Sequence, residues 1–174
     1  MSMKDSDTLA PAIPVVTSGY PFVHNKQLTN LALNKPATAS SEWSAAWKAT
    51  NATDSNMDSY WSPKYPWDSQ SGDLSWWKVD LGSVCTIFRI ELATRPSLPL
   101  ARYNFEVHAS NTVNMENYIV LGIVGSCDII PDGGTWVLNL PTSVSCRYLR
   151  AMKTVKERSL EVDFAIAEFR AFGY

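Results

Sequence analysis

Hydrophobic and polar residues alternate in short runs along most of this chain. In one run Trp77, Val79 and Leu81 are separated by single polar residues, as in a strand with one buried face. The same two-residue period recurs at residues 88–92, 105–109, 119–121, 136–140, 147–152 and 165–172. No segment keeps a 3.6-residue period over roughly ten or more residues. Many short strands at regular spacing predict an all-β sandwich.

The first 29 residues show neither period and are punctuated by prolines. They predict an N-terminal tail or linker over residues 1–29, followed by one domain over residues 30–174. The domain is long enough to bury a single core. The tail also leaves open a homo-oligomer in which this segment exchanges onto a neighbouring subunit, or attachment to a larger multi-domain protein.

Charge and hydropathy narrow the choice of partners. The chain has 15 Lys and Arg against 17 Asp and Glu, with no basic block, whereas nucleic-acid binding needs clustered cations. No apolar run approaches the roughly 18 residues of a membrane helix, and the start lacks the apolar core of a signal peptide. We expect no nucleic-acid partner and no transmembrane segment. A cytoplasmic protein and an excised extracellular module both remain open.

Three cysteines form neither a CxxC motif nor a set of four, so a zinc site is not expected. Cys85 lies in an apolar run and predicts a buried thiol. Cys127 and Cys146 would be able to pair in an oxidising compartment, but spacing alone does not decide this.

Catalytic signatures are absent from the sequence. The only histidines are His24 and His108, and His108 alternates with Glu106 as a strand-surface residue would. No nucleophile motif or metal-protease signature occurs, and the carboxylates show no spacing that pairs an acid with a base. We therefore expect no enzymatic activity.

Residues 49–62 carry oxygen-bearing side chains at a density unusual for this chain, namely Asn51, Asp54, Asn56 and Ser59. A calcium ion takes about six to eight oxygens, and a short loop plus a carboxylate from another strand can supply them. The alternative is a polar loop held by its own Asx-type hydrogen bonds without metal.

Five ordered segments resemble one family. Residues 30–41 resemble the opening of discoidin-type (coagulation factor V/VIII C-type) domains, and residues 52–62 resemble that family's A-x-D-G-N-x-x-T-x-W segment. Residues 76–82 are similar to its W-W-x-V-D-L-G strand, residues 147–150 to its R-Y-[VL]-R strand, and residues 166–173 to its closing strand. The resemblance implies an eight-stranded jelly-roll β-sandwich related to family 32 carbohydrate-binding modules and F-type lectins.

The resemblance also implies a structural calcium ion. Carried over by position, carboxylates would come from Asp54 and Glu168, a hydroxyl or carbonyl from Ser59, and backbone oxygens from Asn51, Asn56 and Ala167. Ser55 stands where the family usually has glycine, so its turn must adopt an angle that serine tolerates.

The same relatives suggest which residues bind a sugar. Arg95 and Arg102 have the interval of two sugar-contacting arginines in F-type lectins, although Leu98-Pro99 replaces the paired cysteines and Ser62 replaces a histidine. The other candidates are Tyr65 or Trp67 as an aromatic platform, Glu42 as a polar contact, and Phe164 as an edge. In the alternative, Arg95 caps a loop and Arg102 is a solvated strand residue. We expect Trp61 and Trp77 to be core residues, because they lie inside strand-like runs.

The resemblance favours a non-catalytic carbohydrate-binding module or lectin for galactose- or fucose-type glycans. An extracellular or cell-surface location follows from the same resemblance. The alternative is a protein- or phospholipid-docking discoidin domain in cell adhesion, in which Leu98 and Leu100 beside the two arginines imitate an apolar spike above a basic collar.

Overall fold

The computed structural model describes residues 27–64, 74–95, 103–128, 130–131, 133–155 and 164–174. These residues form strands and one short 3-10 helix, η1, at Ala49–Thr53. The strands are β1 Thr29–Asn30, β2 Ala37–Ala39, β3 Trp76–Thr94, β4 Phe105–Ser110, β5 Ile119–Val124, β6 Thr135–Lys153 and β7 Ile166–Gly173. The prediction of an all-β sandwich is confirmed.

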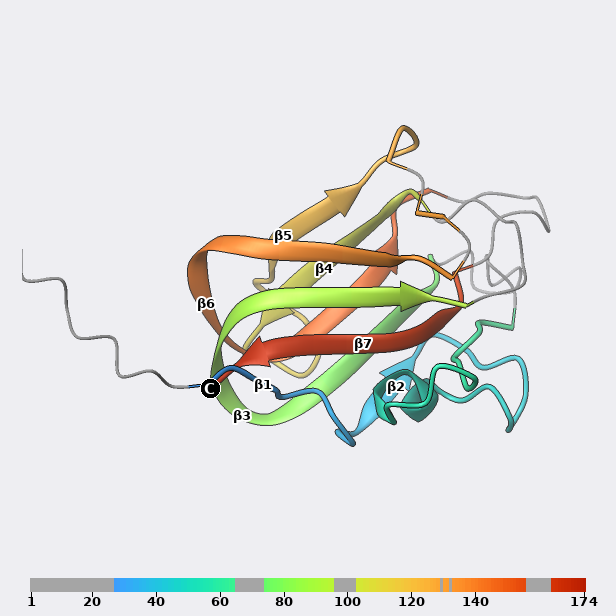
Figure 1. Cartoon of the computed structure of the whole chain (residues 1–174), viewed down its shortest axis with the longest axis horizontal. Helices are drawn as coiled ribbons and strands as arrows, with labels where there is room; N and C mark the ends of the chain where they lie inside the picture. The colour runs from blue at the N-terminus through green and yellow to red at the C-terminus, as the bar shows by residue number, and fades with distance from the viewer. Residues whose placement is uncertain (1–26, 65–73, 96–102, 129, 132, 156–163) are drawn as a thin grey trace, which may run out of the picture.

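Two long strands, β3 and β6, join the two layers of the sandwich. In one layer, the first part of β3 pairs with β2 on one side and with the second part of β6 on the other. The second part of β6 also pairs with β4, and β4 pairs with β5. The second part of β3 pairs with β7 and the first part of β6. The β3–β6 register shifts between Asp80 and Cys85 and again between Ile87 and Arg89. Figure 1 shows both strands curving at the end of the molecule where the C-terminus lies.

The core lies between the layers and contains the residues of the predicted alternation. Trp61 and Trp77 are fully buried, as expected, and the Trp77 ring lies 4.9 Å from Phe169. Trp61 exchanges backbone hydrogen bonds with Ile166 at 2.9 and 3.0 Å. This bridge holds the segment after η1 against the start of β7.

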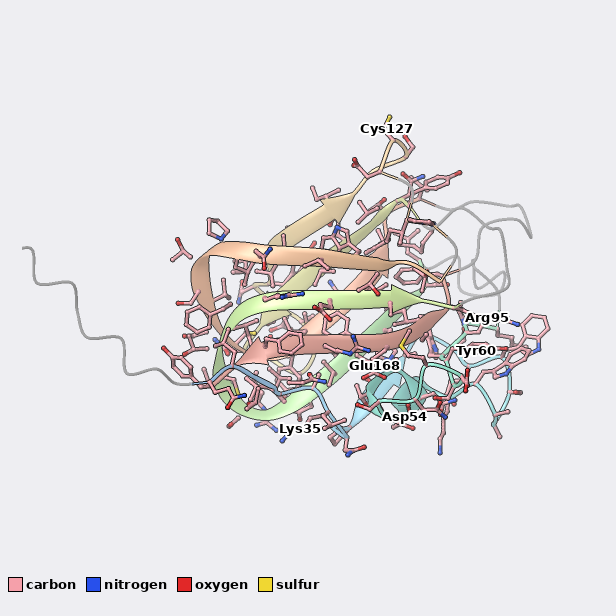
Figure 2. The ribbon with its side chains drawn as sticks, in the orientation of Figure 1. Lys35, Asp54, Tyr60, Arg95, Cys127 and Glu168 are labelled. Carbon is pink, nitrogen blue, oxygen red and sulfur yellow. The ribbon has the colours of Figure 1, made fainter. Side chains whose placement is uncertain are left out.

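The cysteines are arranged differently from the pair considered above. Cys146 lies directly opposite Cys85 across β3 and β6, whereas Cys127 is exposed beyond the end of β5, at the tip seen in Figure 2. All three thiols are free. Cys85 is half-buried, and the more deeply buried thiol is Cys146.

His108 is not the surface residue that its alternation suggested. Its side chain points away from the core, yet only 2% of the residue is exposed because Tyr118 stacks on the ring at 4.2 Å. Within the described residues no helix is long and apolar enough to cross a membrane. Residues 1–26 of the expected tail lie outside the described residues. Thr29, the last residue of that tail, is in β1 and pairs with Gly173 of β7.

Candidate functional site

The loop around η1 is organised by side chains that bind backbone groups. The Glu42 carboxylate accepts a hydrogen bond from the Ala49 amide at 2.7 Å, at the first residue of η1. The Asn51 amide group donates to the carbonyls of Ala46 at 2.7 Å and Tyr60 at 3.1 Å. These bonds satisfy polar groups at both ends of the loop, so the loop has a defined shape.

Asp54 is the centre of the following turn. Its Oδ1 accepts the Asn56 N–H at 2.8 Å, and its Oδ2 accepts the Ser59 hydroxyl at 2.7 Å. The Asn56 side chain repeats the pattern by accepting the Asp58 N–H at 3.0 Å. The loop therefore contains Asx turns of the kind that polar loops form on their own.

Glu168, on β7, is the buried acid next to this turn. Its Oε2 accepts the Ser55 N–H at 3.1 Å, while its buried Oε1 has no hydrogen-bond partner. Burial raises the pKa of Glu168 to about 7, with Arg170 opposing the shift and Asp54 adding to it. Ser55 has a φ of 63°, the left-handed conformation expected for a position where the family carries glycine.

A cation fits this donor chemistry only if most of its ligands are neutral oxygens. The described residues contain no group of three or more His, Cys, Asp or Glu side chains that would hold a metal. Asp54 and Glu168 are therefore the two carboxylates available here. The unpartnered Oε1 is the observation that a bound cation would account for, because buried polar atoms are almost always paired. Calcium accepts such a shell of carbonyls with few carboxylates.

A second cluster lies beyond this loop, where β3 ends. The Arg95 guanidinium carbon is 4.1 Å from the centre of the Tyr60 ring and 5.6 Å from that of Trp47. Trp47 lies 5.3 Å from Tyr60 and 6.1 Å from Trp43, measured between ring centres. Trp43 is 50% exposed. Figure 2 shows Arg95 and Tyr60 together at this end, with Asp54 and Glu168 nearer the sheet.

A family model described as the F5/8 type C domain matches residues 36–158, which is more than half of the chain. The chain belongs to the F5/8 type C domain family. No curated protein matches the chain.

Solved structures of similar shape include several carbohydrate-binding proteins. Chitosan-binding module 1 from the chitosanase/glucanase of Paenibacillus sp. IK-5 is 27% identical, with a TM-score of 0.66, and the match covers 83% of this chain and 99% of the module. A fucolectin from striped bass, Morone saxatilis, is 22% identical with a TM-score of 0.70, covering 84% of this chain and 49% of the lectin. The family 32 module of C. perfringens NanJ, solved with galactose, is 17% identical with a TM-score of 0.64, covering 84% and 98%. The last two similarities establish the fold alone.

One sugar-site expectation for this F5/8 type C domain is wrong. Phe164 is only 4% exposed. The centre of its ring lies 5.7 Å from that of Trp61 and 5.5 Å from that of Phe105. It is therefore a core residue, because the backbone bridge between Trp61 and Ile166 brings it in between the layers. Glu42 is exposed, beside Trp43, with one carboxylate oxygen bound to η1.

Other expectations fall on parts of the domain that the structure does not describe. Tyr65, Trp67 and Arg102 lie outside the described residues, as do Leu98 and Leu100 of the alternative lipid-docking surface. Sequence reasoning did not propose Tyr60 as a sugar-site residue. The available signal was a Tyr-Trp pair, in which one ring faces the core and its neighbour faces the opposite side.

Proposed function

We propose that this domain is a carbohydrate-binding module with its sugar site on the surface formed by Trp43, Trp47, Tyr60 and Arg95. The contact that carries the proposal is the Arg95 guanidinium over the Tyr60 ring at 4.1 Å. A guanidinium over an aromatic ring is restricted by the cation–π contact, and its planar fork of N–H donors suits neighbouring sugar hydroxyls.

The chemistry of this surface suits a sugar ring. An exposed indole such as Trp43 can cover the apolar face of a pyranose, while Arg95 donates hydrogen bonds to neighbouring hydroxyls. Glu42 adds an acceptor next to Trp43. A shallow site of this kind binds terminal sugars or short oligosaccharides.

Galactose- and fucose-type glycans are the proposed ligands. The similarity to a chitosan-binding module, at 27% identity, adds glucosamine oligosaccharides to the candidates. The proposed role is non-catalytic, alone or attached to an enzyme, in an extracellular or cell-surface setting.

A structural calcium ion is part of this proposal. It would bind Asp54, Glu168 and Ser59 together with backbone oxygens at Asn51, Asn56 and Ala167. The buried Glu168 oxygen without a hydrogen-bond partner supports a cation beside it. The ion would hold the η1 loop against β7 and thereby fix Tyr60, without contacting the sugar.

The testing experiment is a glycan array probed with folded protein, followed by calorimetry on the best ligands. We expect binding to a restricted set of neutral or amino sugars, competed by the free monosaccharide. An array without any bound glycan, using protein whose folding is verified by its melting curve, would overturn the proposal.

A further inference from the structure

Three cationic or basic residues form one row across the outer face of one layer. This layer consists of β2, the first part of β3, the second part of β6, β4 and β5. Lys78 on β3 is the register partner of Arg150 on β6, which is in turn the partner of His108 on β4. Their sequence neighbours Trp77, Val79, Leu149 and Ala151 are core residues. The row therefore points away from the core.

The segment between β4 and β5 covers part of this row. Met115 is buried to 4% exposure, and the Val113 carbonyl accepts a hydrogen bond from the Lys78 ammonium. A pocket of about 210 Å³ remains between this segment and the sheet, lined by Trp76, Lys78, Asn114, Met115 and Arg150. It is smaller than the roughly 300–1,000 Å³ of drug-sized sites, so it suits one ring or one charged group.

Two cations line the pocket, and no carboxylate does. The acids around it are engaged elsewhere, since Asp80 forms a two-pronged bond with Arg147 at 2.8 and 2.9 Å. Glu116 accepts a hydrogen bond from Asn114, on the segment above. Among the described residues, neither Lys78 nor Arg150 has a carboxylate partner.

Arg150 is held in place by a neutral group rather than by an acid. Its Nε and Nη2 lie 3.2 and 3.0 Å from His108 Nδ1, and arginine can only donate. His108 must therefore accept at Nδ1 and carry its proton on Nε2, which donates to Glu106 at 2.9 Å. The imidazole is neutral in this arrangement, so it orients Arg150 without cancelling its charge.

The two cations oppose each other electrostatically. Burial is the first cause that lowers the pKa of Lys78, and the charge of Arg150 is the second. Burial also lowers the pKa of Arg150. The charge of Asp80 offsets part of this effect at Lys78, although no carboxylate of the described residues bonds either cation. Facing cations without a bonded acid destabilise the native state unless an anion joins them, and a bound oxyanion would receive charge-assisted hydrogen bonds from both.

We propose that this pocket is a second ligand site, in which Lys78 and Arg150 bind the carboxylate or sulfate of a small ring compound that lies against Trp76. The Lys78 ammonium already lies 5.7 Å from the centres of the Trp76 and Tyr148 rings. The site is separate from the Arg95 surface. Only the identification of the ring as an acidic sugar rests on the proposed function.

The test is a titration of ¹⁵N-labelled protein with glucuronate, glucose 6-sulfate and neutral glucose. We expect the two acidic sugars to shift the Trp76 indole and the amides of residues 111–118, while glucose leaves them unchanged. The tighter of the two acidic sugars identifies the natural oxyanion as a carboxylate or a sulfate. Because Trp43 and Trp47 give their own indole signals, failure here is distinguishable from failure at the Arg95 surface.

Variants make the test specific. Lys78→Gln should weaken acidic-sugar binding at least tenfold, and Lys78→Arg should keep it. Lys48→Gln, at the exposed position just before η1, should not change it. Arg150→Gln should have the same effect as Lys78→Gln, provided that its spectrum remains that of folded protein. Equal shifts with glucose, no shifts with either acidic sugar, or unchanged affinity in Lys78→Gln would each overturn the proposal.

Discussion

The Ser55 backbone N–H donates a hydrogen bond to Glu168 Oε2 across 113 positions of sequence. Serine provides this contact from a left-handed backbone conformation, at a φ of 63°. The bond joins the polar loop after η1 to β7, the strand that also pairs with Trp61. The other Glu168 oxygen is buried without a partner, and the first two predictions follow from it.

Calcium should stabilise the domain. At a free concentration a hundredfold above its Kd, a ligand specific to the native state adds about 2.7 kcal/mol, or roughly 5–10 °C in melting temperature for a chain of this size. Chelation should remove this gain, and Asp54→Ala should abolish the response to calcium. Asp58→Asn is the matched control in the same loop and should respond like the parent protein. A melting curve insensitive to chelator, with no calcium by elemental analysis, would contradict the metal assignment.

The metal-free domain should lose stability as the pH rises. The pKa of a glutamate is ordinarily 4.5, as in an unfolded chain, and that of Glu168 in the native state is about 7. Between these values the native state binds more protons than the unfolded chain, so its stability falls with increasing pH. Urea unfolding in chelator at pH 5, 6 and 7.5 measures this slope, and Glu168→Gln should flatten it. With calcium the trend should be offset above about pH 7, where the ionised carboxylate binds the ion. A parent slope equal to that of Glu168→Gln would refute the prediction.

Arg95→Ala should weaken glycan binding by at least tenfold, measured by calorimetry with the best ligand from the array. The reason is the loss of the forked donor that Tyr60 orients. Arg95→Lys keeps the charge but not the fork, so it should recover little of the affinity. Lys48→Ala is the control for net charge and should bind normally. Full binding by Arg95→Ala would move the site elsewhere.

Phe164 and Trp43 should have opposite roles. Phe164→Ala removes a buried ring between Trp61 and Phe105 and should cost about 3–5 kcal/mol of unfolding free energy. Its folded fraction should still bind glycan. Trp43→Ala removes a half-exposed ring and should lower affinity with little change in unfolding free energy. Paired denaturation and binding curves test both, and a stable Phe164→Ala protein that no longer binds would reverse this assignment.

Oxidation should join Cys85 to Cys146. The two residues are directly opposite across β3 and β6, a spacing within disulfide reach. Glutathione disulfide would accept the two electrons and leave two reduced glutathiones. Burial raises the pKa of Cys146 to about 12, so the reaction should start at Cys85 and be slow. Peptide mapping should find this link in Cys127→Ser and lose it in Cys85→Ser. A Cys127–Cys146 link would contradict the register.

The alternating pattern predicted the strands and the buried Trp61 and Trp77, and the density of oxygen-bearing side chains indicated the polar loop around Asp54. These features depend on local geometry, because successive side chains of a strand face opposite sides whatever lies around them. The resemblance to the family added the prediction that Glu168 lies beside the polar loop and shares a calcium ion with Asp54. It did not reveal that one Glu168 oxygen is orphaned, which depends on how closely the loop packs on β7.

Tertiary structure decided the rest. His108 follows the alternation, because it faces away from the core, but the ring of Tyr118 covers it. Phe164 precedes β7 and is buried between Trp61 and Phe105, both of them distant in sequence. Cys146 lies opposite Cys85, and Lys78 opposite Arg150, because of the register between β3 and β6, which pairs residues more than sixty positions apart. Alternation fixes which side of a strand a residue faces, whereas the partner on that side is fixed by long-range pairing and by the bends of β3 and β6. The sequence therefore determined the layers and the composition of the loops, and only the folded chain determined which charges, thiols and rings meet.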